Sequence, residues 1–479
     1  TITWGDGSTS TGTVVSNNDG TYRVDAPNHT YIEEGTYTVT VTVQHDALAA
    51  LTTAGQTIVV ADQQLTNLAS ANLPPATTES ATIGPIQGLA TFTDPAGRGV
   101  EPIGDYSATV NWGDGTVSPA SIISMGAGNF RVDAPEHIYN AAGTFIVNVT
   151  IKHDALPTVT SPDQSIVVVP AMVAVGPGNG GGAEVRVLNA RTGALIANFF
   201  PFGPFWSGSI SVALGDLNGD GVEDLVVGAG GGGGPRVIAY NLQNNAKMAD
   251  FFAYSSDFRG GVNVAVGDYN GDGKGDIVTG TGDSGGPQVE VFSGAGLGTS
   301  SPPPLLASFF AYSADFRNGV HVAAGDVDGD GKADIITGSG SGGGPQVEVF
   351  QGGSQALLYS FFAYDPTGRF GVNVGAGDMN GDGKADILTG AAGGGASHVK
   401  MFDGATGDQV LSFYGFQATS RDGVYVASTD LNGDGVDDIV AGTGSGIQGQ
   451  VKIFDPKNLD QEALYNAFDI GFIGGVQVG

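Results

Sequence analysis

Five short acidic loops carry the residues best suited to chemistry in this sequence. Each follows the pattern D-x-[ND]-x-D-G-x-x-D and continues into an apolar, β-branched segment such as 276–280. Oxygen side chains at positions 1, 3, 5 and 9, with glycine at position 6 for a sharp turn, let a short loop wrap a hard cation. One such loop alone could be a solvated acidic turn. Because five copies keep the carboxylates while the intervening residues change, we predict about five Ca²⁺ sites.

The predicted ligands are the side chains at positions 1, 3, 5 and 9 and the backbone carbonyl at position 7. In chain order these residues are Asp216, Asn218, Asp220, Val222 and Asp224; Asp268, Asn270, Asp272, Lys274 and Asp276; Asp326, Asp328, Asp330, Lys332 and Asp334; Asp378, Asn380, Asp382, Lys384 and Asp386; and Asp430, Asn432, Asp434, Val436 and Asp438. An EF-hand would need a bidentate Glu at position 12 and flanking helices. Position 12 is Val, Thr or Ala in these loops, and no helical periodicity follows them, which also excludes a dockerin-like pair.

Composition limits the classes of protein to which the chain can belong. Its 479 residues predict two to four domains, and 81 glycines lying between β-branched runs indicate an all-β protein. The absence of cysteine excludes disulfides and thiolate metal sites. A net charge of −31 disfavours nucleic acid and anionic membranes as partners. No stretch is long and apolar enough to predict a membrane span, and no signal peptide is recognisable at the N-terminus.

The first part of the chain contains two copies of one unit at a constant offset of 108 residues. Segments 4–7 and 112–115 both have the sequence WGDG, and RVDAP recurs at 23–27 and 131–135. Alternating apolar residues in 37–43 and 145–151 predict strands with one buried face, and the spacing of strands and turns favours a β-sandwich. The counterpart of 63–109 would precede Thr1, so we expect the first copy to be incomplete and the chain to be a segment of a longer polypeptide.

The WGDG turns, followed by H-x-Y and by G-T-[YF]-x-V, resemble the PKD-type immunoglobulin-like domains of bacterial surface proteins. The resemblance implies two tandem sandwiches, at residues 1–62 and 63–170. Two repeated pairs, His45 with Asp46 and His153 with Asp154, could act as a base with its orienting partner. Because they recur in tandem modules, we interpret them as structural. We also expect Asp6 and its repeat Asp114 to cap local backbone.

A different repeat begins at Ala171 and continues to the end of the sequence. Successive loops begin 52, 58, 52 and 52 residues apart, and an insertion within 296–304 accounts for the longer interval. Each unit contains four apolar segments, which at this period is typical of β-propeller blades. The segments G-V-x-V-A-x-G-D, the acidic loop, D-I-x-x-G and x-V-x-V-F resemble the FG-GAP/VCBS repeats of integrin-α-like propellers. The resemblance implies a cation between the first and second strands of a blade, although Phe-Gly before the first strand survives only at 370–371.

Counting segments predicts how the propeller closes. The domain at 171–479 opens with the second, third and fourth strands of a unit, then has five complete units, and ends with a lone first strand at 475–479. The last strand and the three opening strands would together form a sixth blade. We therefore expect two Ig-like β-sandwiches, the first incomplete, followed by a six-bladed propeller with four-stranded blades; seven blades are the alternative.

These features favour a non-enzymatic adhesion or scaffold segment of a secreted or cell-surface protein, in which Ca²⁺ stabilises the propeller. The expected partner is a protein or glycan, other copies of the chain or a neighbouring surface protein, bound through loops and not through the metal. A carbohydrate-binding propeller is the first alternative. A calcium-dependent polysaccharide-degrading enzyme ranks last, because no acid, base and nucleophile gather outside the loops. The single histidines His321 and His398 are assigned no role, and aromatic residues at the blade ends are expected to pack between blades.

Overall fold

The computed structural model describes residues 1–32, 34–95, 103–154, 156–178, 180 and 182–479. Within this part the regular structure is β, apart from two 3-10 turns, η1 (Ile103–Asp105) and η2 (Gly294–Gly296), so the predicted all-β class is confirmed. No helix in the described residues is long and apolar enough to cross a membrane. The chain divides into two compact units. The first comprises Thr1–Pro74, Thr82–Ile138 and Thr144–Ile166, and the second comprises Pro75–Ala81, Tyr139–Gly143 and Val167–Gly479.

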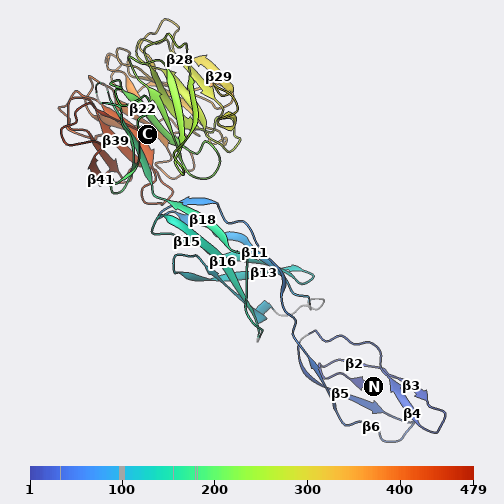
Figure 1. Ribbon diagram of the computed structural model, residues 1–479. Helices are drawn as coiled ribbons and strands as arrows, with labels where there is room; N and C mark the ends of the chain where they lie inside the picture. The colour runs from blue at the N-terminus through green and yellow to red at the C-terminus, as the bar shows by residue number, and fades with distance from the viewer. Residues whose placement is uncertain (33, 96–102, 155, 179, 181) are drawn as a thin grey trace. The chain divides into compact units, whose positions relative to one another are not determined.

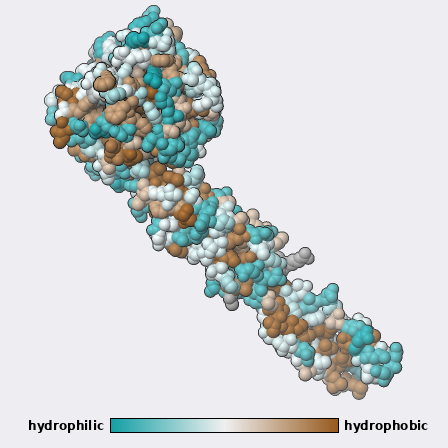
Figure 2. All heavy atoms as spheres, viewed as in Figure 1, coloured by the Kyte–Doolittle hydropathy of each residue, from teal (hydrophilic) through white to brown (hydrophobic). Residues whose placement is uncertain are grey.

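Residues 1–62 form an open sheet and a hairpin. The sheet contains β1 (Ile2–Thr3), β2 (Thr9–Ser10), β5 (Gly35–Val43), β6 (Leu51–Thr52) and β7 (Gln56–Val60), and the hairpin pairs β3 (Thr13–Ser16) with β4 (Tyr22–Asp25). The strand predicted at 37–43 is present within β5, but the alternate residues of β5 are only partly buried, so the predicted buried face is not formed. Tyr22 and Val59 are 70% and 72% exposed, so much apolar surface remains uncovered here. Figure 2 shows hydrophobic patches on the visible face of this part, which lies at the N label of Figure 1.

Residues 65–170 form a larger β-structure with a closed core. Its strands are β8 (Thr66–Ser70), β9 (Ala76–Thr78), β10 (Thr82–Ile83), β11 (Ile86–Thr93), β12 (Tyr106–Asn111), β13 (Val117–Gly126), β14 (Asn129–Ala134), β15 (His137–Ile138), β16 (Gly143–His153), β17 (Val159–Thr160) and β18 (Gln164–Val169). The main sheet runs β8-β11-β14-β13-β12-β16, and β9 pairs in parallel with β18. Alternate residues of β12 and β16 are buried, and Trp112, which continues the alternation of β12 by one step, is fully buried.

The described part of the chain beyond Ala171 contains six sheets of four strands each, and each sheet is ordered by sequence neighbours. Five are β22 (Ile210–Gly215), β23 (Asp224–Ala229), β24 (Arg236–Asn241), β25 (Ala246–Phe252); β26 (Val262–Gly267), β27 (Asp276–Thr281), β28 (Gln288–Phe292), β29 (Leu305–Phe310); β30 (Val320–Gly325), β31 (Asp334–Ser339), β32 (Gln346–Phe350), β33 (Leu357–Phe362); β34 (Val372–Gly377), β35 (Asp386–Ala391), β36 (His398–Phe402), β37 (Gln409–Tyr414); and β38 (Val424–Thr429), β39 (Asp438–Thr443), β40 (Gln450–Phe454), β41 (Gln461–Asn466). The sixth runs β21 (Leu195–Phe199), β20 (Val185–Asn189), β19 (Met172–Pro177), β42 (Val476–Val478).

The first strands of these sheets pack against one another in a cycle. β22 contacts β26, and the contacts continue through β30, β34, β38 and β42 back to β22. We call these six the inner strands. β42 pairs with β19 in antiparallel register. The first and last strands of the region 171–479 are thus paired, as the strand count predicted. The sheets thus surround a common centre, in the rounded body that carries the C label in Figure 1.

Burial explains why the second strand of each sheet is so apolar. All six residues of β27 are buried, as are those of its counterparts β23, β31, β35 and β39, because neighbouring sheets cover both of their faces. Glycine is required at position 280, where an added Cβ would collide with the carbonyl oxygen of Val320 in the next sheet. Hydrophobic clusters that each join two neighbouring sheets form the core.

The aromatic residues at the ends of the fourth strands pack between sheets, as predicted. Phe251 contacts Phe292 of the next sheet with ring centroids 4.9 Å apart, and the hydroxyl of Tyr254 donates to the carbonyl oxygen of Gln288 at 3.1 Å. Tyr364 bonds to the carbonyl of His398 in the same way, at 2.7 Å. These rings therefore hold the sheets at a fixed spacing.

Candidate metal centre

The five acidic loops connect an inner strand to the second strand of the same sheet, at the place implied by the sequence resemblance. In the second loop, position 1 directly follows β26 and position 9 is the first residue of β27. Gly271 and Gly273, at positions 4 and 6, have φ angles of 77° and 83°. Side chains other than glycine rarely adopt these angles, which explains why the loops keep glycine at both places.

The carboxylate at position 1 organises each loop. In the second loop Asp268 Oδ1 accepts the N–H of Gly271 at 2.7 Å, and Asp268 Oδ2 accepts the N–H of Gly273 at 2.7 Å. The equivalent pair of bonds is present in the other four loops. Successive N–H groups that donate to one carboxylate hold it in a fixed orientation, as a cation ligand requires.

The carboxylate at position 9 is buried. Its residue is at most 1% exposed in all five loops, namely Asp224, Asp276, Asp334, Asp386 and Asp438. In each loop it accepts the N–H of position 2, for example that of Tyr269 by Asp276 at 3.1 Å. Burial raises the pKa of Asp224 to about 7 and that of Asp276 to about 6, and the nearby charges at positions 1 and 5 act in the same direction. A bound cation would remove this unfavourable concentration of negative charge.

Side chains at positions 1, 3 and 9 converge. In the third loop Asp326, Asp328 and Asp334 each place one carboxylate oxygen within 4.8 Å of the others. In the second loop position 3 is Asn270, whose buried Oδ1 lacks a hydrogen-bond partner among the described residues. Carboxylate oxygens that converge in this way, together with an unpartnered amide oxygen at position 3, fit a hard divalent cation.

Positions 5 and 7 lie on the same loops. The carboxylate at position 5 accepts the N–H of position 7, as between Asp272 and Lys274 at 3.1 Å, which holds both residues on the loop. The position 7 carbonyls remain predicted ligands. A bound cation would be held by the carboxylates at positions 1, 5 and 9, the side-chain oxygen at position 3 and the backbone carbonyl at position 7. It would neutralise the negative charge of these carboxylates and fix the conformation of the loop.

The repeated histidines have structural surroundings. His29 Nε2 lies 2.7 Å from Asp6 Oδ2 and stacks on Trp4 at 4.4 Å, and His137, Asp114 and Trp112 repeat this arrangement. Asp6 also accepts the N–H of Ser8 at 2.9 Å, the local backbone cap that was predicted. His153 is buried, with Nδ1 3.4 Å from Asp62 Oδ1, whereas His45 is exposed.

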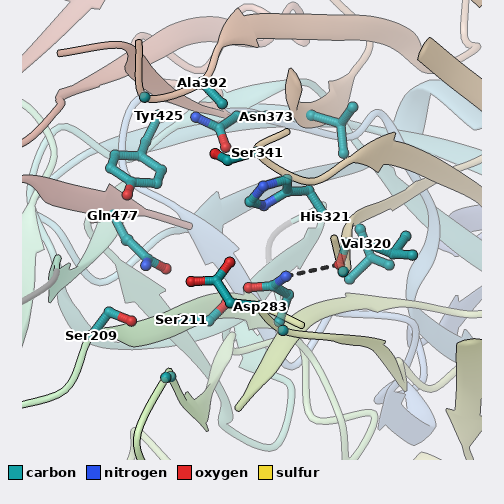
Figure 3. Close-up of a pocket in the computed structure, with 18 of the residues that line it drawn as sticks. Ser209, Ser211, Asp283, Val320, His321, Ser341, Asn373, Ala392, Tyr425 and Gln477 are labelled. Carbon is teal, nitrogen blue, oxygen red and sulfur yellow. Dashed lines mark hydrogen bonds between the residues drawn. The ribbon is translucent and has the colours of Figure 1, made fainter. Parts of the chain in front are cut away.

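A second candidate site, which sequence reasoning missed, lies at the centre of the propeller. A cavity of about 340 Å³ is lined by all six inner strands and by the links between second and third strands. Figure 3 shows His321, Tyr425, Gln477 and Asp283 around it. The sequence does contain a periodic signal for this cavity. A polar residue stands at the second place of each inner strand and recurs at the same intervals as the acidic loops.

Family comparison identifies the repeat. The FG-GAP-like repeat matches residues 216–279 and 268–337, and the FG-GAP repeat matches 370–409 and 426–454. The chain carries FG-GAP repeats. Each of the five acidic loops lies within a matched FG-GAP segment, so the predicted resemblance is confirmed for the repeat itself.

The chain is similar to several solved structures, each at low sequence identity and low TM-score. A rhamnogalacturonan lyase of Bacillus licheniformis is 13% identical, with 85% of this chain and 84% of that chain covered and a TM-score of 0.35. The rhamnogalacturonan lyase YesW is 14% identical over 86% of each chain, with a TM-score of 0.34. The β-propeller domain of Cps50 (Swd1) from Myceliophteria thermophila is 11% identical over 64% and 96%, with a TM-score of 0.37. No curated protein sequence is significantly similar to the chain.

Proposed function

We propose that the chain is a non-enzymatic adhesion or scaffold segment whose FG-GAP propeller is stabilised by about five Ca²⁺ ions. The observation that carries the calcium assignment is the buried carboxylate at position 9, repeated in five loops. Burying a charge is unfavourable unless an opposite charge or a metal ion accompanies it. Asp276 is fully buried, and the nearest charges that act on it are those of Asp272 and Asp268, which are also negative.

The architecture that supports this function is a closed ring of six blades following two Ig-like sandwiches. The cycle of inner strands and the pairing of β42 with β19 support six blades over seven. The repeated stacks of Trp on His and the buried Trp112 support related sandwiches in 1–62 and 63–170. Sandwiches of this kind would serve as spacers and the propeller as the binding head.

An extracellular location follows from the expected affinity. Calcium sites in extracellular modules have Kd values of roughly 10⁻⁴–10⁻³ M, which only extracellular calcium would saturate. The lack of cysteine is compatible with this location, because calcium takes the stabilising role that disulfides have in other secreted domains.

Counting bound calcium tests the assignment. Equilibrium dialysis of the full chain against millimolar Ca²⁺ should give about five bound ions per chain. Removing the position 5 carboxylates of two loops, with Asp272→Ala and Asp330→Ala, should reduce the count by about two. A wild-type count of one or none would overturn the proposal.

The non-enzymatic part of the proposal has a separate test. Incubating the calcium-loaded chain with a panel of acidic and neutral polysaccharides should release no new chain ends, measured as reducing sugar and as absorbance of unsaturated products. Sustained turnover that depends on the chain would contradict it and favour a polysaccharide-degrading enzyme.

A further inference from the structure

Each inner strand carries one polar side chain at its second residue. We call these six residues the polar ring: Ser211, Asn263, His321, Asn373, Tyr425 and Gln477. All six line the central cavity of about 340 Å³. The links between second and third strands line the same cavity, so the polar ring lies at the end of the central channel where these links are found.

The residue type at the polar ring differs between blades, whereas the neighbouring positions of the inner strands are nearly uniform. The residue before each ring position is always Ile or Val, and the residue two places beyond it is always Ala or Gly: Ala213, Ala265, Ala323, Gly375, Ala427 and Gly479. The six ring positions, by contrast, hold five different residue types. Packing alone would be satisfied by the same residue in every blade. Five residue types at six positions create an asymmetric surface, which suits recognition of an asymmetric small molecule.

Three members of the polar ring tie neighbouring sheets together. Asn263 Nδ2 donates to the carbonyl oxygen of Val320 at 2.8 Å, a bond drawn in Figure 3. Asn373 Nδ2 donates to the carbonyl oxygen of Val424 at 2.8 Å, and Ser211 Oγ accepts the N–H of Val264 at 3.1 Å. These bonds fix the side chains of three of the six members of the polar ring.

The other three members, His321, Tyr425 and Gln477, surround the open space in Figure 3, and the side chains of Tyr425 and Gln477 interact across two neighbouring inner strands. Asp283 joins them from the link after β27. Its counterparts in four other sheets are Gly231, Ser341, Gly393 and Ser445, all of which also line the cavity, so a carboxylate is present at only one of these five places.

The electrostatics of these groups favour neutral hydrogen bonding. Burial lowers the pKa of His321, opposed by the charge of Asp283, and burial raises the pKa of Tyr425. A neutral imidazole both donates and accepts, as does a carboxamide, while the carboxylate of Asp283 accepts from two hydroxyls at once. Tyr425 adds a flat apolar face.

We propose that this end of the central channel binds one residue of a neutral sugar, held by Asp283, His321, Gln477 and the ring of Tyr425. A vicinal diol presents donors and acceptors in alternation, which a carboxylate, an imidazole and a carboxamide match, and its C–H face packs on an aromatic ring. A divalent cation would find two carboxylates here, those of Asp283 and Asp422, against three or more in each acidic loop. An anionic ligand would meet the charges of two carboxylates, Asp283 and Asp422, against the single guanidinium of Arg421 in the cavity lining. The inference rests on the proposed function in taking the propeller as a non-catalytic binding head.

The test uses the full chain with millimolar Ca²⁺ on an array of neutral, sulfated and uronic-acid glycans, followed by titration of the strongest neutral glycan. Two variants install residues found at the same place in a sister sheet, which protects the fold: Asp283→Ser, as at Ser341 and Ser445, and His321→Asn, as at Asn263 and Asn373. The matched control is Asp315→Ser, which removes an exposed carboxylate that does not line the cavity.

We expect wild-type binding to neutral glycans, a tenfold or greater loss of affinity in Asp283→Ser and in His321→Asn, and wild-type affinity in Asp315→Ser. Neutral-glycan binding that both variants retain would place the site elsewhere and overturn the inference while leaving the binding head intact. Binding to acidic glycans alone, or to none, would overturn it as well. Chain-dependent cleavage of the arrayed glycans would instead contradict the proposed function.

Discussion

Ala174 and Gly479 exchange both of their backbone hydrogen bonds: each N–H donates to the carbonyl oxygen of the other residue, at 2.8 and 3.1 Å. Ala174 belongs to β19, the first strand after residue 171, and Gly479 directly follows β42, the last strand in the sequence. The short strand β42 therefore supplies the inner strand of a sheet whose other three strands come more than 270 residues earlier.

Deleting Phe472–Gly479 should destabilise the entire propeller. The deletion removes the buried side chains of Val476 and Val478 and leaves the inner edge of β19 unpaired. We expect a single propeller transition in calorimetry, shifted to lower temperature. The matched control shortens the link between β28 and β29 by deleting 298–301, which contributes to no inner strand. Equal melting temperatures for the β42 deletion and the intact chain would contradict closure through β42.

A calcium chelator should lower the melting temperature of the propeller and leave that of residues 1–170 nearly unchanged. At ten times Kd each site contributes RT ln 11, about 1.4 kcal/mol, so five independent sites contribute about 7 kcal/mol. This is comparable to the stability of a whole domain, about 5–15 kcal/mol. Calorimetry of the full chain with and without chelator measures the effect. A propeller transition that does not move with chelator would contradict calcium binding in the acidic loops.

The substitution Asp224→Asn should have opposite effects with and without calcium. Asp224 Oδ2 accepts the N–H of Leu217 at 3.2 Å and an N–H of Asn218 Nδ2 at 3.1 Å, while Oδ1, near the backbone N–H of Leu242, completes no hydrogen bond among the described residues, so an amide can keep both bonds to Oδ2. In chelator the variant removes a buried charge and should raise the melting temperature. In calcium it removes a charged ligand and should lower it.

Asp276→Asn is the matched comparison for this experiment. Both oxygens of Asp276 accept a backbone N–H, from Tyr269 at 3.1 Å and from Gly294 at 2.9 Å. An amide there would turn its own N–H group toward one of these donors, which is unfavourable. The variant should therefore melt lower in both conditions. If calcium raised the melting temperature of wild type and of Asp224→Asn by the same amount, the first loop would bind no cation.

The ion pair of Asp250 should produce a defined pH dependence. Arg236 Nε and Lys247 Nζ each lie 2.7 Å from a carboxylate oxygen, and the hydrogen bond from Arg236, followed by that from Lys247, lowers the pKa of Asp250 to about 2. Because the folded pKa is below the unfolded value of about 4, the pair stabilises the fold above pH 4 and ceases to do so as the pH falls toward 2.

Comparing wild type with Asp250→Asn measures this effect. At pH 6 the variant should be less stable by about 1 kcal/mol, since the pair is partly exposed. The difference in melting temperature should shrink between pH 4 and pH 2. A difference that is constant over this range would mean that the ion pair does not stabilise the folded state.

Repetition made most of this fold predictable. The first, second, third and fourth strands of each unit, the loop between the first two, and the pairing of β42 with β19 all followed from aligning units of the sequence with one another. The packing role of Tyr254 and its equivalents was predictable for the same reason, because a residue that recurs in every blade faces the same neighbour in each.

Features that differ between repeats, or that join distant residues, were harder to predict. His321 was assigned no role because no partner motif accompanies it in the sequence. Its significance depends on Asp283 and Tyr425, which the ring brings to one cavity from different sheets. Likewise the pairing of His29 with Asp6 spans 23 residues and depends on the turn that places the side chains 2.7 Å apart.

The ladder between β19 and β42 also determines how the ring would respond to tension. Ala174 pairs with Gly479 at one end of the ladder, and Pro177 pairs with Val476 toward the other. A force that separates residues 171 and 479 would act on the Ala174–Gly479 end first and open the hydrogen bonds one after another, as a zip opens. Strands loaded in shear would instead resist with all their bonds at once. A small force would therefore separate β42 from β19 while the other sheets of the propeller remain folded.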